Sequence, residues 1–119
     1  MKRKMWSALA MACALAAPMA SIAAGAIAVD DKRGETEPGY GFALNKSSRE
    51  EASRAALREC REHDNEDCRV VVRFDTCGAY AASSKFYGVG WGETRREAEN
   101  MALDQCEKKT CEVIVAKCE

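Results

Sequence analysis

One stretch of this chain is repeated further along it. SREEASRAALREC runs from Ser48 to Cys60, and TRREAENMALDQC runs from Thr94 to Cys106. A GAxA segment and an alternating glycine segment precede each stretch, and a β-branched run ending in cysteine follows each. An internal repeat constrains the fold because both copies must form the same supersecondary unit. Two copies are too few for a solenoid, so the sequence predicts one closed domain with a pseudo-twofold axis.

Each copy is predicted to form two strands, a helix and a third strand. Capping boxes of the form S/T-x-x-E begin both helices, at Ser48 and at Thr94. The runs Val70–Val72 and Val113–Val115 lack polar alternation, which predicts strands buried on both faces as the core. Small residues recur every fourth position in the helices and predict a narrow buried stripe. These residues are Ala52, Ala56 and Cys60, then Ala98, Ala102 and Cys106.

The predicted fold class follows from this unit. We expect an α+β fold, in which a single small disulfide-stabilised domain is built from two tandem strand-strand-helix-strand repeats. The first repeat covers residues 25–77 and the second covers residues 78–118.

The amino-terminal segment has the features of a secretory signal peptide. A basic start, residues 2–4, precedes an uncharged apolar run over residues 5–20, and small residues follow. We expect a signal peptide over residues 1–24 and a single domain over residues 25–119, located in the periplasm or secreted. The apolar run contains Pro18 and is shorter than the roughly 20 residues that span a bilayer. No stable membrane span is therefore expected after cleavage.

Removal of this leader changes the charge and the cysteine count. It takes away three of the 18 basic residues and none of the 19 acidic ones, which leaves a net charge of −4. An acidic chain argues against nucleic acid or an anionic membrane as the partner. Cys13 leaves with the leader, and the residues before it lack the leucine of a lipoprotein signal. The six remaining cysteines indicate a disulfide framework.

The repeat suggests one pairing among the many that six cysteines allow. One bridge in each copy would join the end of the helix to the start of the next strand. The remaining two cysteines, taken as equivalent residues of the two repeats, would meet across the pseudo-dyad and tie down the carboxyl terminus. The predicted pairs are Cys60 with Cys68, Cys106 with Cys111, and Cys77 with Cys118.

The ordered set of motifs also resembles a known family. GAIA, GYGFA, a helix ending in cysteine, a valine strand, CGAYA, GVGWG and a second helix ending in cysteine follow one another here. This order resembles the bacterial secreted family catalogued as domain of unknown function 4189, over essentially all of residues 25–119. The resemblance implies a small exported domain with paired cysteines. It implies no catalytic residues, because the family has no agreed activity.

The acidic loop EHDNED, residues 62–67, is the place where the two copies differ most. It holds His63, the single histidine of the chain, beside Asp64. A divalent cation is one hypothesis, but the loop lacks the glycine and distal glutamate of a calcium loop, and one histidine is too little for a closed zinc site. We interpret the loop as a solvated turn and expect no metal and no cofactor.

The sequence places no evident base near a serine that could act as a nucleophile. Ser48 opens a helix and Ser83 belongs to a predicted turn, and His63 lies between predicted disulfide partners. We therefore expect that the protein is not an enzyme. A small envelope-acting enzyme that uses carboxylates or His63 is the alternative.

Aromatic side chains alternate with glycine in both glycine segments. They are Tyr40 and Phe42 in the first copy and Tyr87 and Trp91 in the second. Rings beside bare backbone suit the binding of an extended peptide or a sugar. The alternative is that the rings fill a small core while the glycines let the helices approach. Trp91 is taken to match Phe42 in the repeat, which favours packing.

The candidate binding residues are therefore Tyr40, Phe42, Tyr87, Trp91, His63 and Asp64. We expect a noncatalytic extracytoplasmic binding module, such as an inhibitor, immunity or host-directed effector protein. Its partner would be an extracytoplasmic protein or an envelope component. Besides the small enzyme, the remaining alternative is a structural or stress-protective envelope protein.

Overall fold

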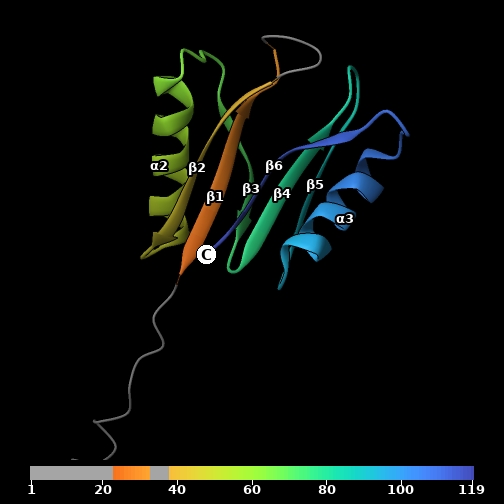
Figure 1. Ribbon diagram of the computed structural model, residues 1–119. Helices are drawn as coiled ribbons and strands as arrows, with labels where there is room; N and C mark the ends of the chain where they lie inside the picture. The colour runs from red at the N-terminus through yellow and green to blue at the C-terminus, as the bar shows by residue number, and fades with distance from the viewer. Residues whose placement is uncertain (1–22, 33–37) are drawn as a thin grey trace, which may run out of the picture.

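Two three-stranded sheets lie face to face between two helices in a computed structural model of the protein (Figure 1). The structure describes residues 23–32 and 38–119, so nearly all of the expected signal peptide lies outside the described residues. The elements are β1 (Ala24–Asp30), β2 (Gly39–Lys46), α2 (Arg49–Glu62), β3 (Arg69–Phe74), β4 (Cys77–Ala82), β5 (Tyr87–Gly92), α3 (Arg95–Cys106) and β6 (Glu112–Cys118). The predicted α+β class and the order of elements in each half are confirmed.

The strand order is the same in both sheets. It is β2-β1-β3 in the first and β5-β4-β6 in the second, with antiparallel neighbours. A register shift falls at the matching place in each, between Ile27 and Ala28 opposite β3 and between Tyr80 and Ala81 opposite β6. The first strand of each half is thus the central strand.

This order corrects the predicted core. Every residue of β1 and β4 is buried, whereas β3 and β6 are outer strands. Val72 and Val115 are buried, but Val71 and Ile114 are only half-buried. The valine runs were expected to be covered on both faces, but a strand at the edge of a sheet keeps part of its surface open. The fully covered strands are the GAIA and GAYA segments.

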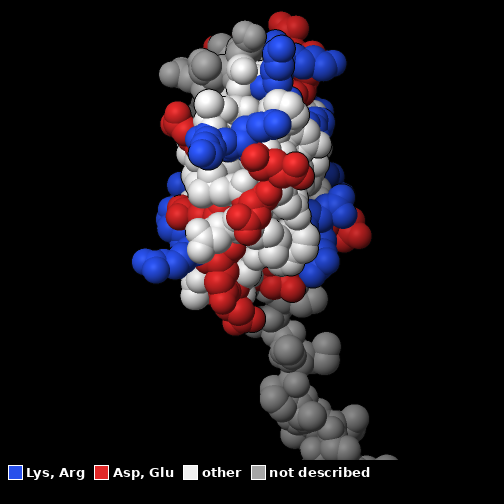
Figure 2. All heavy atoms as spheres, turned by 90° about the vertical axis from the view of Figure 1, so that its right-hand side faces the viewer, with Lys and Arg blue, Asp and Glu red and all other residues white. Residues whose placement is uncertain are grey.

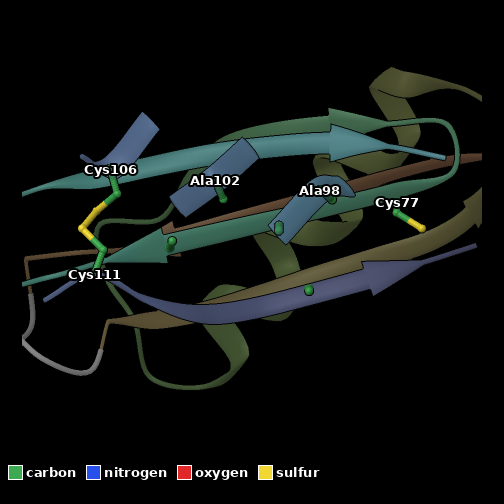
Figure 3. Packing of buried hydrophobic residues seen from close by; sticks show 8 residues of the cluster. Cys77, Ala98, Ala102, Cys106 and Cys111 are labelled. Carbon is green, nitrogen blue, oxygen red and sulfur yellow. A yellow bond between two sulfur atoms is a disulfide. The ribbon is translucent and has the colours of Figure 1, made fainter. Parts of the chain in front are cut away.

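Alternation along β1 and β4 separates three apolar layers. Ile27 and Tyr80 point between the sheets, where they pack with Phe74, Val72 and Val115. Small side chains of the same strands point outward to α2 and α3. Figure 3 shows the second of these outer layers, in which Ala98, Ala102 and Cys106 of α3 lie over β4. The predicted buried stripe of both helices is confirmed.

Glycine in the outer strands allows the helices to lie this close. A Cβ atom on Gly41 would lie 2.2 Å from the backbone nitrogen of Cys60 in α2, and one on Gly88 would lie 2.2 Å from the carbonyl oxygen of Ala102 in α3. Neither helix could keep its position against a side chain there. The interpretation that the glycines let the helices approach the sheets is therefore correct.

The two helix starts differ from each other. In α3 the box is complete, because Thr94 Oγ1 accepts from the Glu97 amide and Glu97 Oε1 accepts from the Thr94 amide. In α2, Ser48 Oγ accepts from the Glu51 amide, but the Glu51 carboxylate bonds to Ser47 instead. The predicted capping box at Ser48 is therefore only half formed.

Three disulfides form, and they are the three pairs that the sequence predicts. Cys60–Cys68 and Cys106–Cys111 each join the end of a helix to the segment that leads into the next strand. The third, Cys77–Cys118, joins β4 to β6, so it lies within one sheet.

The reason given for the third pair is wrong. Gly25 lies opposite Phe74 in the first sheet, and Gly78 lies opposite Lys117 in the second. Cys118 therefore occupies the place of Asp75. The two cysteines are not equivalent residues, and no pseudo-dyad brings them together.

Candidate functional site

The acidic loop after α2 is anchored by buried polar side chains. Asn65 is 3% exposed, and its Nδ2 donates to the carbonyl oxygen of Cys60 over 2.8 Å. Asp30, 2% exposed, accepts from the Asp67 amide over 3.1 Å. Asp64 adopts a left-handed backbone, and its side chain is exposed. Within the described residues, no group of three His, Cys, Asp or Glu side chains is placed to hold a metal ion.

Three of the six candidate residues meet beside this loop. Tyr40, Phe42 and His63 line one shallow groove of about 340 Å³. Both rings are half-buried, and Lys117 Nζ lies 4.3 Å from the centre of the Phe42 ring. The Phe42 amide donates to Glu59, which also lines the groove. Tyr40 and Phe42 are thus tied to the sandwich by packing.

Tyr87 and Trp91 lie elsewhere, on β5. The glycine-aromatic strands were expected to form one surface, but β2 and β5 are outer strands of different sheets. Contacts between the sheets place β2 over β6 and β5 over β3, at opposite edges of the sandwich. No single surface therefore contains all the candidate rings.

Aromatic exposure is concentrated at β5. The exposed large hydrophobic side chains of the described chain are Phe86 at 47%, Tyr87 at 48% and Trp91 at 50%. Register also overturns the proposed match of Trp91 with Phe42. Val89 lies opposite Tyr80 where Phe42 lies opposite Ile27, so Val89 takes the place of Phe42. Trp91 is free of that packing role.

Trp91 borders a groove between the edges of the two sheets, which we call the Trp91 groove. Its volume is about 410 Å³. Five of its eight lining residues are apolar and come from β3 and β5, and an ion pair of 3.0 Å between Arg49 and Asp75 lies at its rim. The lining residues are Arg49, Val71, Val72, Arg73, Phe74, Asp75, Val89 and Trp91.

A second hollow, which we call the end pocket, lies where β1 finishes and the β4–β5 hairpin turns. Its volume is about 450 Å³, and Tyr80 and Tyr87 line it with their rings stacked at 5.8 Å between centroids. Burial raises the pKa of Tyr80 to about 12. Asp31 bonds to Arg69 over 2.8 Å, and this hydrogen bond raises the pKa of Arg69. Arg69 lies 5.1 Å from the centre of the Tyr87 ring.

Sequence reasoning missed most of the end pocket. Tyr80 was read as part of a GAYA strand, and the period-two alternation of that strand was the signal that could have assigned its ring to the inner face. Asp31 and Arg69 are distant in sequence. Their pairing depends on β3 lying beside β1, which no local pattern indicates.

The hydroxyls and carboxylates considered for catalysis have structural partners. Ser48 and Thr94 cap helices, and Ser83 Oγ accepts from the Phe86 amide over 3.3 Å in the β4–β5 turn. Glu51 and Glu97 bond to backbone amides at the helix starts. No helix in the part of the chain that the structure describes is both long and apolar enough to cross a membrane.

Comparisons with known proteins give relatives without an assigned activity. Two uncharacterized proteins, Rv1813c of Mycobacterium tuberculosis and Mb1843c of Mycobacterium bovis, are each 37% identical over 67 residues. The match covers 56% of this chain and 45% of the relative, so it spans less than half of the relative's length.

A solved structure and a family model extend the likeness to most of the chain. The NMR structure of Rv1813c matches with a TM-score of 0.57 at 24% identity, over 87% of this chain and 81% of the other. That likeness supports the fold alone. The model of the family described as domain of unknown function (DUF4189) matches residues 24–118, and the chain therefore belongs to this family.

Proposed function

We propose that this protein is a noncatalytic extracytoplasmic binding module that takes an extended segment of a partner protein into the Trp91 groove. The observation that carries the proposal is the place of Trp91, half exposed on an outer strand beside a groove that apolar side chains of β3 and β5 help to line. Tryptophan is among the residues that contribute most to protein interfaces when a partner covers it.

Both strands that border the groove are open along one side. β3 and β5 are the last strands of their sheets, and within the described residues neither has a further strand beside it. An open edge presents backbone amides and carbonyls that an added strand can pair with. Strand addition would supply backbone hydrogen bonds, and the groove would take an apolar side chain of the partner.

The scaffold suits this role because it is cross-linked. Three disulfides hold the ends of both helices and the last strand, so little conformational freedom is lost on binding. Disulfides of this kind are typical of oxidising compartments, which supports an extracytoplasmic location. An inhibitor, an immunity protein and a host-directed effector would each use such a rigid surface.

Peptide selection tests the proposal. Extended peptides are selected by display against the wild-type protein alone, and their affinities for the wild type and for Trp91→Ala are then compared. Tyr40→Ala is the matched control, since it removes a ring from the opposite edge. Trp91 emission is isolated as the difference between the wild type and Trp91→Phe. We expect selected peptides to shift this emission to shorter wavelength and to bind Trp91→Ala at least about tenfold more weakly, as for a hot-spot residue. Equal binding to the wild type and Trp91→Ala would contradict the proposal.

A further inference from the structure

The end pocket lies at the opposite end of β5 from Trp91 and is not used by the proposed function. The turn at Asp31 and Lys32 forms one side of it, and the β4–β5 hairpin turn forms the other. That hairpin turn is fixed by a hydrogen bond of 2.8 Å from the Ser83 amide to the Phe86 carbonyl oxygen. The volume of the end pocket, about 450 Å³, is within the range of small-molecule sites.

A tyrosine hydroxyl belongs to the pocket wall. Tyr80 is 1% exposed as a residue, and it lines the pocket. Because burial raises the pKa of Tyr80 to about 12, the phenol stays protonated at neutral pH and can donate. The pocket therefore offers a hydroxyl donor to an acceptor from outside the chain.

The charge around the pocket is positive although the chain as a whole is slightly acidic. Lys32 and Lys85 line it, while the Asp31 carboxylate is already paired with Arg69. Lys108 Nζ adds a further cation, 4.7 Å from the centre of the Phe86 ring. Figure 2 shows the upper end of the α3 face, where Lys and Arg side chains lie with Asp and Glu side chains among them, above a band of acidic side chains. The two lysines of the pocket lining favour an anionic group there.

Aromatic side chains form the apolar part of the wall. Phe86 and Tyr87 are each about half exposed and both line the pocket. The Tyr87 ring is held by its stacking on Tyr80, so it is a fixed surface. Fixed rings give a flat ligand a large contact area at little cost in entropy.

We propose that the end pocket binds a small ring compound that carries one carboxylate or phosphate. The anionic group accepts a hydrogen bond from the Tyr80 hydroxyl and pairs with Lys32 and Lys85. The ring of the ligand packs against Phe86 and Tyr87. Carboxylate and phosphate share this chemistry, and separate probes distinguish them.

Amide chemical shifts of the isotope-labelled protein provide the test. Benzoate and phenyl phosphate are the two anionic probes, benzyl alcohol is the neutral ring, and inorganic phosphate is the anion without a ring. We expect saturable shifts at Asp31, Lys32 and Ser83 to Tyr87 with at least one anionic ring, and much weaker binding of the other two. The tighter of benzoate and phenyl phosphate identifies the anion. Absence of saturation with both, or equal binding of inorganic phosphate, would overturn the proposal.

Three variants locate the binding. Tyr80→Phe removes only the hydroxyl, and we expect about tenfold weaker binding, as for a lost hydrogen bond to a charged group. Lys85→Gln, at an exposed position, should weaken binding in the same direction. Lys109→Gln removes the same charge from the α3–β6 connection and should leave binding unchanged. Loss of affinity in Lys109→Gln equal to that in Lys85→Gln would reduce the effect to overall charge and reject the site.

Discussion

The half of the molecule that contains α2 and the half that contains α3 share one topology but differ in the closeness of the helix to its sheet. Ala26 in β1 lies opposite Ala43, whereas Ala79 at the same place in β4 lies opposite Gly90. A Cβ on Gly90 would lie 2.1 Å from the Ala98 carbonyl oxygen. The first sheet thus accommodates a methyl group at a place where the second sheet has no room for one. The two halves therefore pack differently although they share one topology.

A second difference is the covalent closure of the sheet. Cys77 and Cys118 join β4 to β6, while Ala24 and Asp75 occupy these places in the first sheet. The exposed rings are also concentrated in the second half, on β5 and the turn before it. The more tightly held half therefore contributes the exposed rings of both proposed binding surfaces.

Removal of the sheet-closing disulfide should have the largest effect. The separation of 41 residues between Cys77 and Cys118 corresponds to about 4 kcal/mol of unfolding free energy, against about 2.5 kcal/mol for the separation of 8 between Cys60 and Cys68. Urea unfolding of the two double alanine variants measures the difference. Equal losses of unfolding free energy in the two variants would show that the Cys77–Cys118 bridge does not make the second half the more tightly held one.

Gly90→Ala should have the next largest effect. The added methyl group meets backbone atoms of α3, so the helix must move, and we expect a loss of about 3 kcal/mol. Ala43→Gly at the matching place in the first half should cost only about 1 kcal/mol through chain entropy. Urea unfolding of both variants measures these losses. A loss of about 1 kcal/mol or less for Gly90→Ala would show that α3 can move away from its sheet at little cost.

Loss of either helix cap should have a smaller effect. Thr94→Ala and Ser48→Ala each remove a side chain that accepts from an amide of the first turn, and each should cost about 1 kcal/mol. Thr110→Ala, at an exposed position between α3 and β6, is the control. If thermal unfolding shows no loss for Thr94→Ala beyond that of Thr110→Ala, the complete box of α3 adds nothing to stability.

The smallest expected effect is a pH dependence at the start of α2. Hydrogen bonds from the Ser47 side chain and, to a smaller extent, from the Ser47 amide lower the pKa of Glu51 below its usual range. A lowered folded pKa means that this stabilisation is present above the unfolded pKa and is lost as pH falls through the folded value. Glu51→Gln should therefore lose less stability on acidification than the wild type. Glu50→Gln is the neighbouring control, and identical acid profiles for all three proteins would reject the assignment.

Sequence patterns were sufficient for the local elements. Capping residues, the four-residue spacing of alanine and cysteine, and the glycine alternation predict both helices and their close approach to the sheets. They failed where the outcome depends on which strand becomes central, and this is why the valine runs were assigned to the core. They also failed for Trp91, which was matched with Phe42. The strand pairing places Val89, two residues earlier, at the inner position that corresponds to Phe42.

The sequence by itself determined the repeated unit and the cysteine pairs, since both depend on spacing along the chain. Tertiary structure decided which rings are covered and which polar groups meet. β2 and β5 lie at opposite edges because each is the outer strand of its own sheet. Tyr80, Asp31 and Arg69 come together because β1 and β4 end, and β3 begins, at the same side of the sandwich. The physical reason is that a side chain's exposure depends on the strands that pair around it, and that pairing is a property of the whole fold.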